Sequence, residues 1–214
     1  MSVVKLTVVQ FSLRSLFVAL TVIAIGVGSW TNSARRQQEV VTIVERQGGV
    51  VGYDRNQPLI PRLWSIVETV LGKDYVRSVA WVQMPMLMPG ESALGKPRLP
   101  AVSRLSKLKK LYLNGTSTTD CDLAEIGRCA SLIELHIADT GITDAGIHHL
   151  QGLKKLTVLD LSGAAVSNAA APNLMRLRSV HSMVLDRTKF DDDGIRQLRR
   201  ALGDCIIQHR AFGL

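Results

Sequence analysis

The sequence has few aromatic residues, few cysteines and fewer acidic than basic side chains. Phe, Trp and Tyr make up 5% of its 214 residues, so the apolar core must be aliphatic, which favours repetitive layered packing. Its three cysteines form no CxxC pair, and neither a disulfide framework nor a structural zinc site is expected. Length and composition indicate one domain with an appendage, and they exclude a disordered or collagen-like chain.

Motifs that carry common enzyme chemistries are also missing from the sequence. It contains no GxxxxGK[ST], no GxGxxG after a strand, no HExxH and no GxSxG. Nucleotide, dinucleotide, zinc-protease and α/β-hydrolase chemistries therefore lack their local requirements. We expect a protein that is not an enzyme, with no catalytic residues, no cofactor and no metal site.

A long uncharged segment occupies the N-terminal region. Residues 15–34, between Arg14 and Arg35, carry no charge, and their centre, LFVALTVIAIGVG, is almost entirely aliphatic. As a helix this segment would span about 30 Å, which is the thickness of the hydrocarbon core of a bilayer. The flanking arginines and Trp30 suit the two interfaces of a membrane. We predict one transmembrane helix and hence a single-pass membrane protein.

A cleaved signal peptide is the alternative interpretation of this segment. Lys5 and Arg14 could form the charged region and residues 16–28 the hydrophobic region, and cleavage would release an exported repeat protein. The uncharged span is longer than a usual hydrophobic region, which favours a retained anchor. The positive charges on the two sides do not decide the orientation. By the usual behaviour of N-terminal anchors, we expect the following domain on the extracytoplasmic side.

The rest of the chain contains a sequence repeat. The pattern LxxLxL occurs four times at a fixed interval of 24 residues. Its apolar positions are Leu108/Leu111/Leu113, Leu132/Leu135/Ile137, Leu156/Leu159/Leu161 and Val180/Met183/Leu185. We extend it to Leu202/Cys205/Ile207, 22 residues further on, and to Val76/Val79/Trp81, 32 residues before the first. Six strands are therefore predicted, of which the first and last are irregular.

Each repeat also carries the signals of a short helix. Polar residues that suit helix N-caps follow each strand, at Asp120, Asp144, Asn168 and Asp192. Apolar pairs spaced three apart come next, at Leu123/Ile126, Ile147/Leu150, Ala171/Leu174 and Ile195/Leu198. This spacing puts one face of a helix against the strands. Each repeat is therefore predicted to be a strand, a turn and a helix.

These repeats resemble the leucine-rich repeat, in the short variety LxxLxLxxTxITDAGIxxL that is seen best at residues 132–150. The resemblance covers residues 102–210. The third repeat departs from it, with Ala164 in place of Thr and Pro172 in the first helical turn. The resemblance implies an α/β solenoid with parallel strands on the concave face and short helices on the convex face.

The N-terminal part is similar to that of short bacterial membrane-anchored leucine-rich-repeat proteins. In that group the anchor continues into a helix that ends in a double glycine, here residues 35–49, followed by a short strand, here residues 50–53. The whole layout then has three parts. These are the tail and transmembrane helix at 1–34, a juxtamembrane helix, α/β cap and Pro/Met-rich loop at 35–100, and the repeat domain at 101–214.

Residues between the anchor and the repeats are expected to cap the solenoid. Pro61 suits the first position of a helix that Gly72 would end, and its apolar face would cover the first strand, at residues 76–82. The following stretch, MPMLMPGESALGKPRLP, carries four of the seven prolines. It is predicted to be a loop because it can continue neither a strand nor a helix.

The exposed face of the sheet is the expected binding surface. In LxxLxL the leucines point inward, so the residues between them face out and stack from strand to strand. The central column is expected to begin at Ala80 and end at Ile206. The predicted partner-binding residues are Tyr112, Asn114, Glu134, His136, Asp160, Ser162, Val184 and Asp186. This mixed, mostly polar surface predicts a non-enzymatic protein–protein interaction module whose partner is a protein of unknown identity.

A hydrolase is the alternative that the same face suggests. His136 and Asp160 lie on neighbouring strands and Ser162 follows, so the residue types of a catalytic triad are present. Nothing in a repeat strand creates an oxyanion hole or a strained nucleophile turn, however. A solvated ladder of side chains is therefore the favoured interpretation of this group.

Basic residues recur along one edge of the predicted repeats and give the chain a formal charge of +8. The clusters are Lys107/Lys109/Lys110, Lys154/Lys155, Arg176/Arg178 and Arg196/Arg199/Arg200. Solvation of the outer surface accounts for most of this charge, and contact with anionic lipid is a further expectation. Aromatic residues for base stacking are missing, so nucleic acid is not an expected partner.

Overall fold

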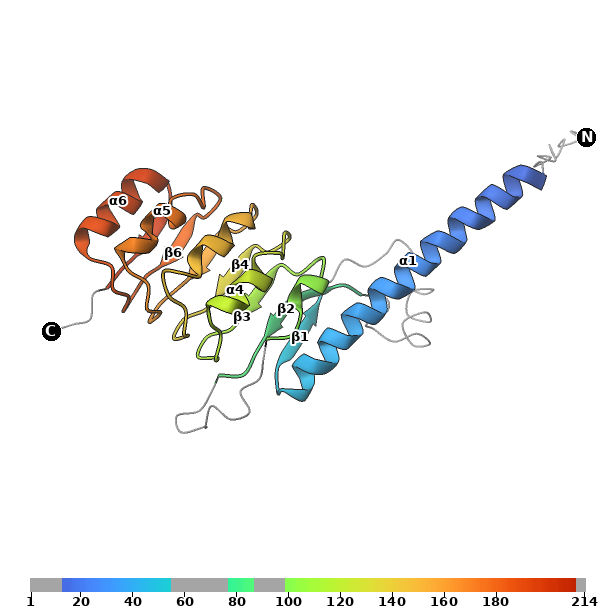
Figure 1. The fold of residues 1–214 in the computed structure, drawn as a ribbon, viewed down its shortest axis with the longest axis horizontal. Helices are drawn as coiled ribbons and strands as arrows, with labels where there is room; N and C mark the ends of the chain where they lie inside the picture. Colours follow the sequence, from blue (N-terminus) through green and yellow to red (C-terminus); the bar gives the residue numbers. More distant parts are fainter. Residues whose placement is uncertain (1–12, 55–76, 87–98, 211–214) are drawn as a thin grey trace, which may run out of the picture.

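The protein is a curved solenoid of strands and short helices with one long helix at its N-terminal end (Figure 1). The computed structural model describes residues 13–54, 77–86 and 99–210. Its helices are α1 (Leu13–Arg46), η1 (Val102–Arg104), α4 (Asp120–Ile126), η2 (Ile147–Gly152), η3 (Asn168–Ala170), α5 (Ala171–Leu174) and α6 (Asp192–Leu202). Its strands are β1 (Val50–Tyr53), β2 (Val79–Gln83), β3 (Lys110–Tyr112), β4 (Glu134–His136), β5 (Val158–Asp160), β6 (Ser182–Val184) and β7 (Ile206–Gln208).

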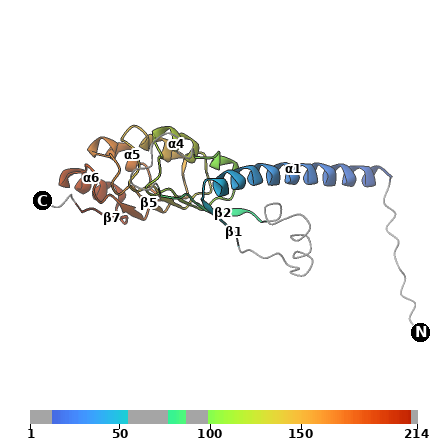
Figure 2. The same ribbon diagram turned by 90° about the horizontal axis from the view of Figure 1, so that it is seen from below.

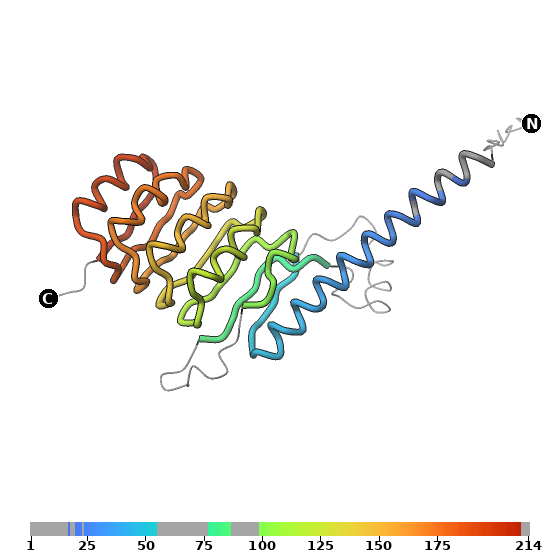
Figure 3. The backbone as a smooth tube through the Cα atoms, viewed as in Figure 1, coloured from blue at the N-terminus to red at the C-terminus, as the bar shows by residue number. Residues whose placement is uncertain are grey.

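The strands form one sheet of seven in the order of the sequence, β1 to β7. β1 pairs with β2 antiparallel, and every later pair is parallel. The sheet covers one face of the solenoid, and the short helices cover the other (Figure 2). The backbone trace shows one turn of the coil for each repeat (Figure 3). The predicted leucine-rich-repeat solenoid is confirmed.

The core lies between these two layers and is aliphatic, as the composition predicts. The LxxLxL positions of the four regular repeats are all buried, from Leu108 through Leu185. The predicted helical pairs, from Leu123/Ile126 through Ile195/Leu198, are also buried and join the same core cluster. Because neighbouring repeats share one continuous core, each repeat is stabilised mainly by the repeats on its two sides.

The first repeat strand lies three residues later than the predicted match of Val76/Val79/Trp81. The buried positions of this segment are Val79, Val82 and Met84. Val82 pairs with Leu111, so it occupies the central leucine position. Trp81 faces outward instead, because its indole lies over Gly52 of β1, where only a residue without a side chain leaves room. The outward column therefore starts at Gln83, and the prediction of Ala80 was wrong.

The last strand keeps the 24-residue interval, so the predicted match of Leu202/Cys205/Ile207 after 22 residues was also wrong. Met183 pairs with Ile207, and Val184 pairs with Gln208. Gln208, rather than Ile206, therefore ends the central column. The pattern is hidden at this strand because polar residues, Asp204 and His209, stand where the earlier repeats have leucine.

The predicted helix N-caps lie one residue too late. The observed N-caps are Thr119, Ser167 and Asp191. Asp120 instead accepts hydrogen bonds from the Thr143 backbone N–H at 2.8 Å and the Thr143 hydroxyl at 2.6 Å. Asp144 accepts the equivalent bonds from Ser167 at 2.7 and 2.6 Å. These carboxylates therefore tie each repeat to the next, which a pattern within one repeat cannot reveal.

The long helix α1 joins the solenoid through its C-terminal third. Val40, Val41 and Val44 are buried in the same core cluster as β2. The Gln37 side chain donates to the Arg77 carbonyl oxygen at 2.6 Å and accepts from the Val79 N–H at 3.2 Å. β1 follows after a turn, at the residues predicted for the short strand. The helix ends at Arg46 rather than at the double glycine.

The predicted transmembrane helix at residues 15–34 is not confirmed. Among the residues that the structure describes, no helix is long and apolar enough to cross a membrane. The helix predicted from Pro61 to Gly72 lies outside the described residues, and so does most of the Pro/Met-rich loop. Met84, at the start of that stretch, is buried, and its N–H donates to the Tyr112 carbonyl oxygen at 3.0 Å.

Candidate functional site

The exposed side of the sheet, called the sheet face below, carries two rows of outward side chains. The strand register defines them, because equivalent residues of neighbouring strands pair directly. One row is Trp81, Lys110, Glu134, Val158, Ser182 and Ile206, and the other is Gln83, Tyr112, His136, Asp160, Val184 and Gln208. Five of the predicted binding residues lie in these rows: Tyr112, Glu134, His136, Asp160 and Val184.

Sequence analysis missed three members of the rows, all on the end strands. Gln83 and Gln208 were missed because the leucine pattern was misaligned there. Trp81 was assigned to the core, although it is half-buried on the sheet face. The signal that could have placed Trp81 is the glycine opposite it, Gly52, since a large aromatic ring beside a glycine on a neighbouring strand is a common packing solution.

An aromatic pair occupies the middle of the sheet face. The rings of Tyr112 and His136 stack with centroids 4.9 Å apart and an interplanar angle of 21°. Glu134 lies beside them, because it accepts from the Tyr112 hydroxyl at 3.3 Å and pairs with the Lys110 ammonium at 2.8 Å. Burial, and then the negative charge of Glu134, raise the pKa of Tyr112. The phenol therefore stays protonated and remains a hydrogen-bond donor at neutral pH.

Asp160 is the next charged group along the same row. Its carboxylate accepts from the Ser162 hydroxyl at 2.6 Å and from the Ser162 backbone N–H at 3.0 Å. The His136 Nδ1 lies 3.7 Å from its other oxygen. Burial acts to raise the pKa of Asp160, but the interactions with His136 and Ser162 outweigh it and hold the pKa below its usual value. Asp160 is therefore a fixed, ionised acceptor on this face.

The remaining predicted residues, Asn114, Ser162 and Asp186, lie at the ends of strands and bind backbone or neighbouring groups. The Asn114 side-chain oxygen accepts from the Ala138 N–H at 2.9 Å, and Asp186 accepts from the Arg210 N–H at 2.7 Å. Ser162 is 9% exposed and orients Asp160. These three side chains hold the loop edge of the sheet face, so they shape it more than they offer free contact groups.

The geometry does not assemble a hydrolase triad from His136, Asp160 and Ser162. In a triad the nucleophile's hydroxyl donates to the histidine, which in turn donates to the carboxylate. Here the Ser162 hydroxyl donates to Asp160 directly, and the serine is buried. Cysteine offers no alternative at Cys129, because burial, and then the nearby charge of Glu125, raise the pKa of that thiol to about 12.

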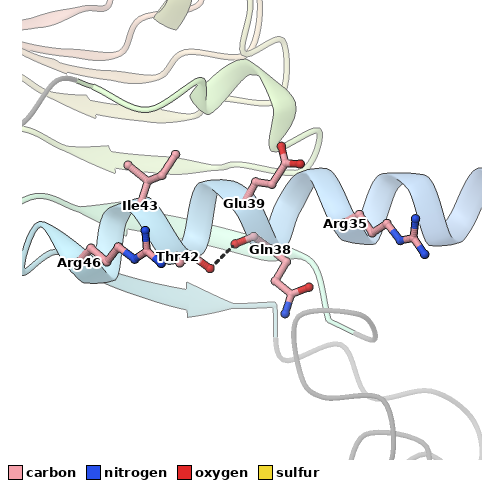
Figure 4. Close-up of a pocket in the computed structure, with 6 residues that line it drawn as sticks. All are labelled: Arg35, Gln38, Glu39, Thr42, Ile43 and Arg46. Carbon is pink, nitrogen blue, oxygen red and sulfur yellow. Dashed lines mark hydrogen bonds between the residues drawn. The ribbon is translucent and has the colours of Figure 1, made fainter.

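A shallow hollow of about 440 Å³ lies on α1, away from the sheet face. Its lining residues are Arg35, Gln38, Glu39, Thr42, Ile43 and Arg46. They all come from one helix, and their side chains point in different directions rather than toward a common centre (Figure 4). Glu39 points toward η1, where it forms an ion pair with Arg104 at 2.8 Å. The hollow therefore marks the junction of α1 with the first repeat.

Comparison with known proteins identifies the fold. No protein-family model and no curated protein matches the chain. The leucine-rich-repeat ectodomain of the receptor kinase SOBIR1 from Arabidopsis thaliana is similar at a TM-score of 0.50 and 15% identity, over 83% of this chain and 92% of that one. At this identity the similarity shows the fold alone, and it agrees with the resemblance to leucine-rich-repeat proteins that the sequence indicates.

Two bacterial structures are also similar over part of the chain. A leucine-rich-repeat protein of Leptospira interrogans has a TM-score of 0.46 and 19% identity, over 66% of this chain and 39% of that one. Internalin C2 of Listeria monocytogenes has a TM-score of 0.42 and 21% identity, over 53% of this chain and 48% of that one. This chain therefore spans less than half the length of either bacterial protein.

Proposed function

We propose that the protein is a non-enzymatic interaction module that binds a protein partner through its sheet face. The observation that carries the proposal is the stacked pair of Tyr112 and His136 in the middle of that face. Both rings are half-buried, and the rows around them present a continuous outward surface. Solenoids of this kind use such extended surfaces for binding, and aromatic side chains supply much of the energy at protein interfaces.

The chemistry of the face indicates where a partner would gain most. Trp81, Tyr112 and His136 lie on three adjacent strands, β2 to β4, and form an aromatic patch. The charged groups on either side of the patch, Glu134 and Asp160, are already oriented by their neighbours. A partner would therefore meet apolar area at the centre and fixed hydrogen-bond acceptors at the rim, which is the usual anatomy of a protein interface.

The proposal predicts that the sheet face can be disabled without unfolding the protein. Tyr112→Ala combined with Asp160→Lys removes half of the aromatic pair and inverts one rim charge. A matched control, His148→Ala with Lys155→Glu, makes the same kinds of change on exposed residues of the helix side. Capture of the copurifying partner, measured by quantitative mass spectrometry, is expected to fall only for the first variant while both keep their melting temperature. Equal capture by the two variants would contradict the proposal.

We also propose that residues 15–34 anchor the protein in a membrane as a single span, with the repeat domain on the extracytoplasmic side. Large apolar side chains along this part of α1 support the anchor. Phe17, Leu20, Val22, Ile25, Val27 and Trp30 are all exposed, by 67% at Phe17 and Ile25. Water disfavours an apolar surface of this extent, and a lipid environment would remove the cost. The alternative is an exported protein released by cleavage of the segment.

A single fractionation experiment tests the anchor, the cleavage and the orientation together. A tag after residue 214 is followed in membrane and soluble fractions after an alkaline wash, and its size is compared with that of the full chain. Full-size tag in the washed membranes is expected, with digestion once protease reaches the outer side of the inner membrane. Soluble tag of reduced size would favour the exported form. Membrane-bound tag that resists until the inner membrane is broken would reverse the proposed orientation.

A further inference from the structure

The direction of α1 relative to the repeats follows from its contacts with β2. Gln37 contacts the start of β2, at residues 77–79. The other end of the helix reaches the end of β2, because a Cβ on Gly49 would lie 2.8 Å from the Gln83 carbonyl oxygen. The helix therefore runs parallel to β2, and all later strands are parallel to β2 as well.

This direction places the N-terminal part of α1 beyond one particular edge of the solenoid. That edge holds the loops that lead from each helix into the next strand, because those loops precede the strands. Figure 1 shows them along the upper side, toward which α1 rises. The ion pair of Glu39 with Arg104 fixes the helix to the same edge. No glycine or proline interrupts residues 31–46, so the apolar part of α1 and its packed part form one continuous rod.

The same edge is strongly basic in the third and fourth repeats. We call the group of Lys154, Lys155, Arg176 and Arg178 the basic edge. No acidic residue occurs between Asp144 and Asp160 or between Asp160 and Asp186. Carboxylates gather on the opposite edge, in the loops that leave the strands: Asp139, Asp144, Asp186, Asp191, Asp192 and Asp193. The solenoid is therefore polarised across its width.

The cations of the basic edge lie around a hollow of about 440 Å³ whose lining includes Lys154, Arg176, Arg178 and Ser179. Among the described residues, Lys154, Lys155 and Arg178 have no acidic partner, and Arg176 donates only to the neutral Gln151 at 3.3 Å. Surface cations elsewhere are neutralised, as at Lys109 with Asp54, Lys110 with Glu134 and Arg187 with Asp139. The uncompensated charge is thus confined to the side toward which the apolar helix points.

We propose that the basic edge docks on the anionic headgroups of the membrane that holds residues 15–34. The inference rests on the proposed anchor and adds a second attachment to it. A helix that spans the bilayer would bring the loops of the basic edge to its surface, since both lie on the same side of one rigid body. Cations near an anionic leaflet are attracted to it. The two attachments together would hold the sheet face across the membrane surface, with the acidic edge directed away from the lipid.

The test uses the full chain reconstituted into vesicles of phosphatidylcholine, with or without phosphatidylglycerol. An environment-sensitive fluorophore is attached at Ser179→Cys in a Cys121→Ser background, since Cys129 and Cys205 are buried. The matched label is at Asp192→Cys on the opposite edge. Headgroup-labelled quencher lipid is expected to quench the first label and not the second, and only in vesicles with phosphatidylglycerol. Raising the salt from about 0.1 M to about 1 M should abolish the difference, because the Debye length falls from about 10 to about 3 Å.

Charge variants complete the test. Each cation near an anionic surface favours attachment roughly fivefold, so Lys154→Gln with Arg178→Gln should weaken docking by roughly 30-fold. Lys189→Gln with Arg210→Gln removes the same charge from the opposite edge and should leave docking unchanged. Protein that stays embedded after an alkaline wash but shows equal quenching at both labels would overturn this inference alone. Protein that fails to embed would overturn the anchor and this inference with it. A Ser179 label that responds to soluble polyphosphate and ignores phosphatidylglycerol would assign the edge to a soluble polyanion instead.

Discussion

Asp120 and Asp144 show how single side chains connect the repeats. Each carboxylate accepts two hydrogen bonds from the turn of the following repeat, one from a backbone N–H and one from a hydroxyl. Asn168 continues the series by accepting from the Asp191 N–H at 3.2 Å. Asp192 occupies the same position in the last repeat, where no further repeat follows among the described residues. One sequence position thus has different energetic weight along the solenoid.

This difference predicts unequal effects of the same substitution. Asp144→Ala leaves the N–H and hydroxyl of Ser167 without their charged acceptor and is expected to lower the free energy of unfolding by about 2 to 3 kcal/mol. Asp192→Ala removes an exposed carboxylate at a helix start and should cost at most about 1 kcal/mol. Urea denaturation of both variants measures the difference. Equal losses would mean that the carboxylate acts only within its own repeat.

Gly163 offers a second test at the scale of one residue. Its φ is +68°, and an added Cβ would collide with the Asp139 carboxylate. Gly163→Ala is therefore expected to cost about 2 kcal/mol of unfolding free energy, from the left-handed backbone and the collision together. Gly141→Ala is the control, because its Cβ would have an ordinary contact of 3.4 Å with the Thr118 carbonyl oxygen. A cost at Gly141 as large as that at Gly163 would contradict this account.

Asp160 should make stability depend on pH in the acid range. Its pKa is lower in the folded protein than the usual value of about 3.9 expected when unfolded. The ionised carboxylate therefore contributes stability above that value, and the contribution is lost as pH falls through the folded pKa. Urea midpoints measured at neutral pH and near pH 3 should differ more for the wild type than for Asp160→Asn. The same acid dependence in both proteins would argue against an ionised, hydrogen-bonded Asp160.

At the scale of elements, the interior repeats could be predicted from sequence and the end strands could not. Leucines mark the core positions of β3 to β6, so period, strand and helix all agreed there. β2 has valines and a methionine at the same positions, and β7 has Asp204 and His209 at two of them. The aliphatic pattern therefore pointed to a shifted register at both ends. Pairing with the neighbouring strand, rather than local composition, fixes the register there.

The candidate site divides in the same way. Tyr112, His136, Asp160 and Val184 were predicted as one column, because their strands repeat at a constant interval. The ring stacking, the bond from Ser162 to Asp160 and the position of Trp81 could not be predicted. They depend on side-chain conformations and on the glycine of β1, which the repeat pattern does not include.

α1 provides the test at the element scale, because adjacent residues on it have opposite environments. Val44 is fully buried against the first repeat, whereas Ile43 is 40% exposed. Val44→Ala should lower the unfolding free energy by about 2 kcal/mol through lost burial and the cavity left behind. Ile43→Ala should cost well under that, about 0.5 kcal/mol. Similar values for the two variants would mean that α1 is not packed on the solenoid.

At the scale of the whole molecule, three surfaces have distinct characters. The sheet face carries oriented aromatic and polar groups, one edge is basic and the opposite edge is acidic. A single continuous helix fixes the direction of all three relative to its apolar part. A small solenoid can therefore present one face in a defined direction, provided that the helix and the repeats move as one body.

The measurement that tests the central claim most directly is photo-crosslinking in intact cells. A photoreactive amino acid is placed at Tyr112 on the sheet face and, in a matched strain, at the exposed His148 on the helix side. The proposal predicts a discrete protein adduct from position 112 that Asp160→Lys removes, and no such adduct from position 148. Adducts of the same protein from both positions, or an adduct from position 112 that persists with Asp160→Lys, would contradict the assignment of partner binding to the sheet face.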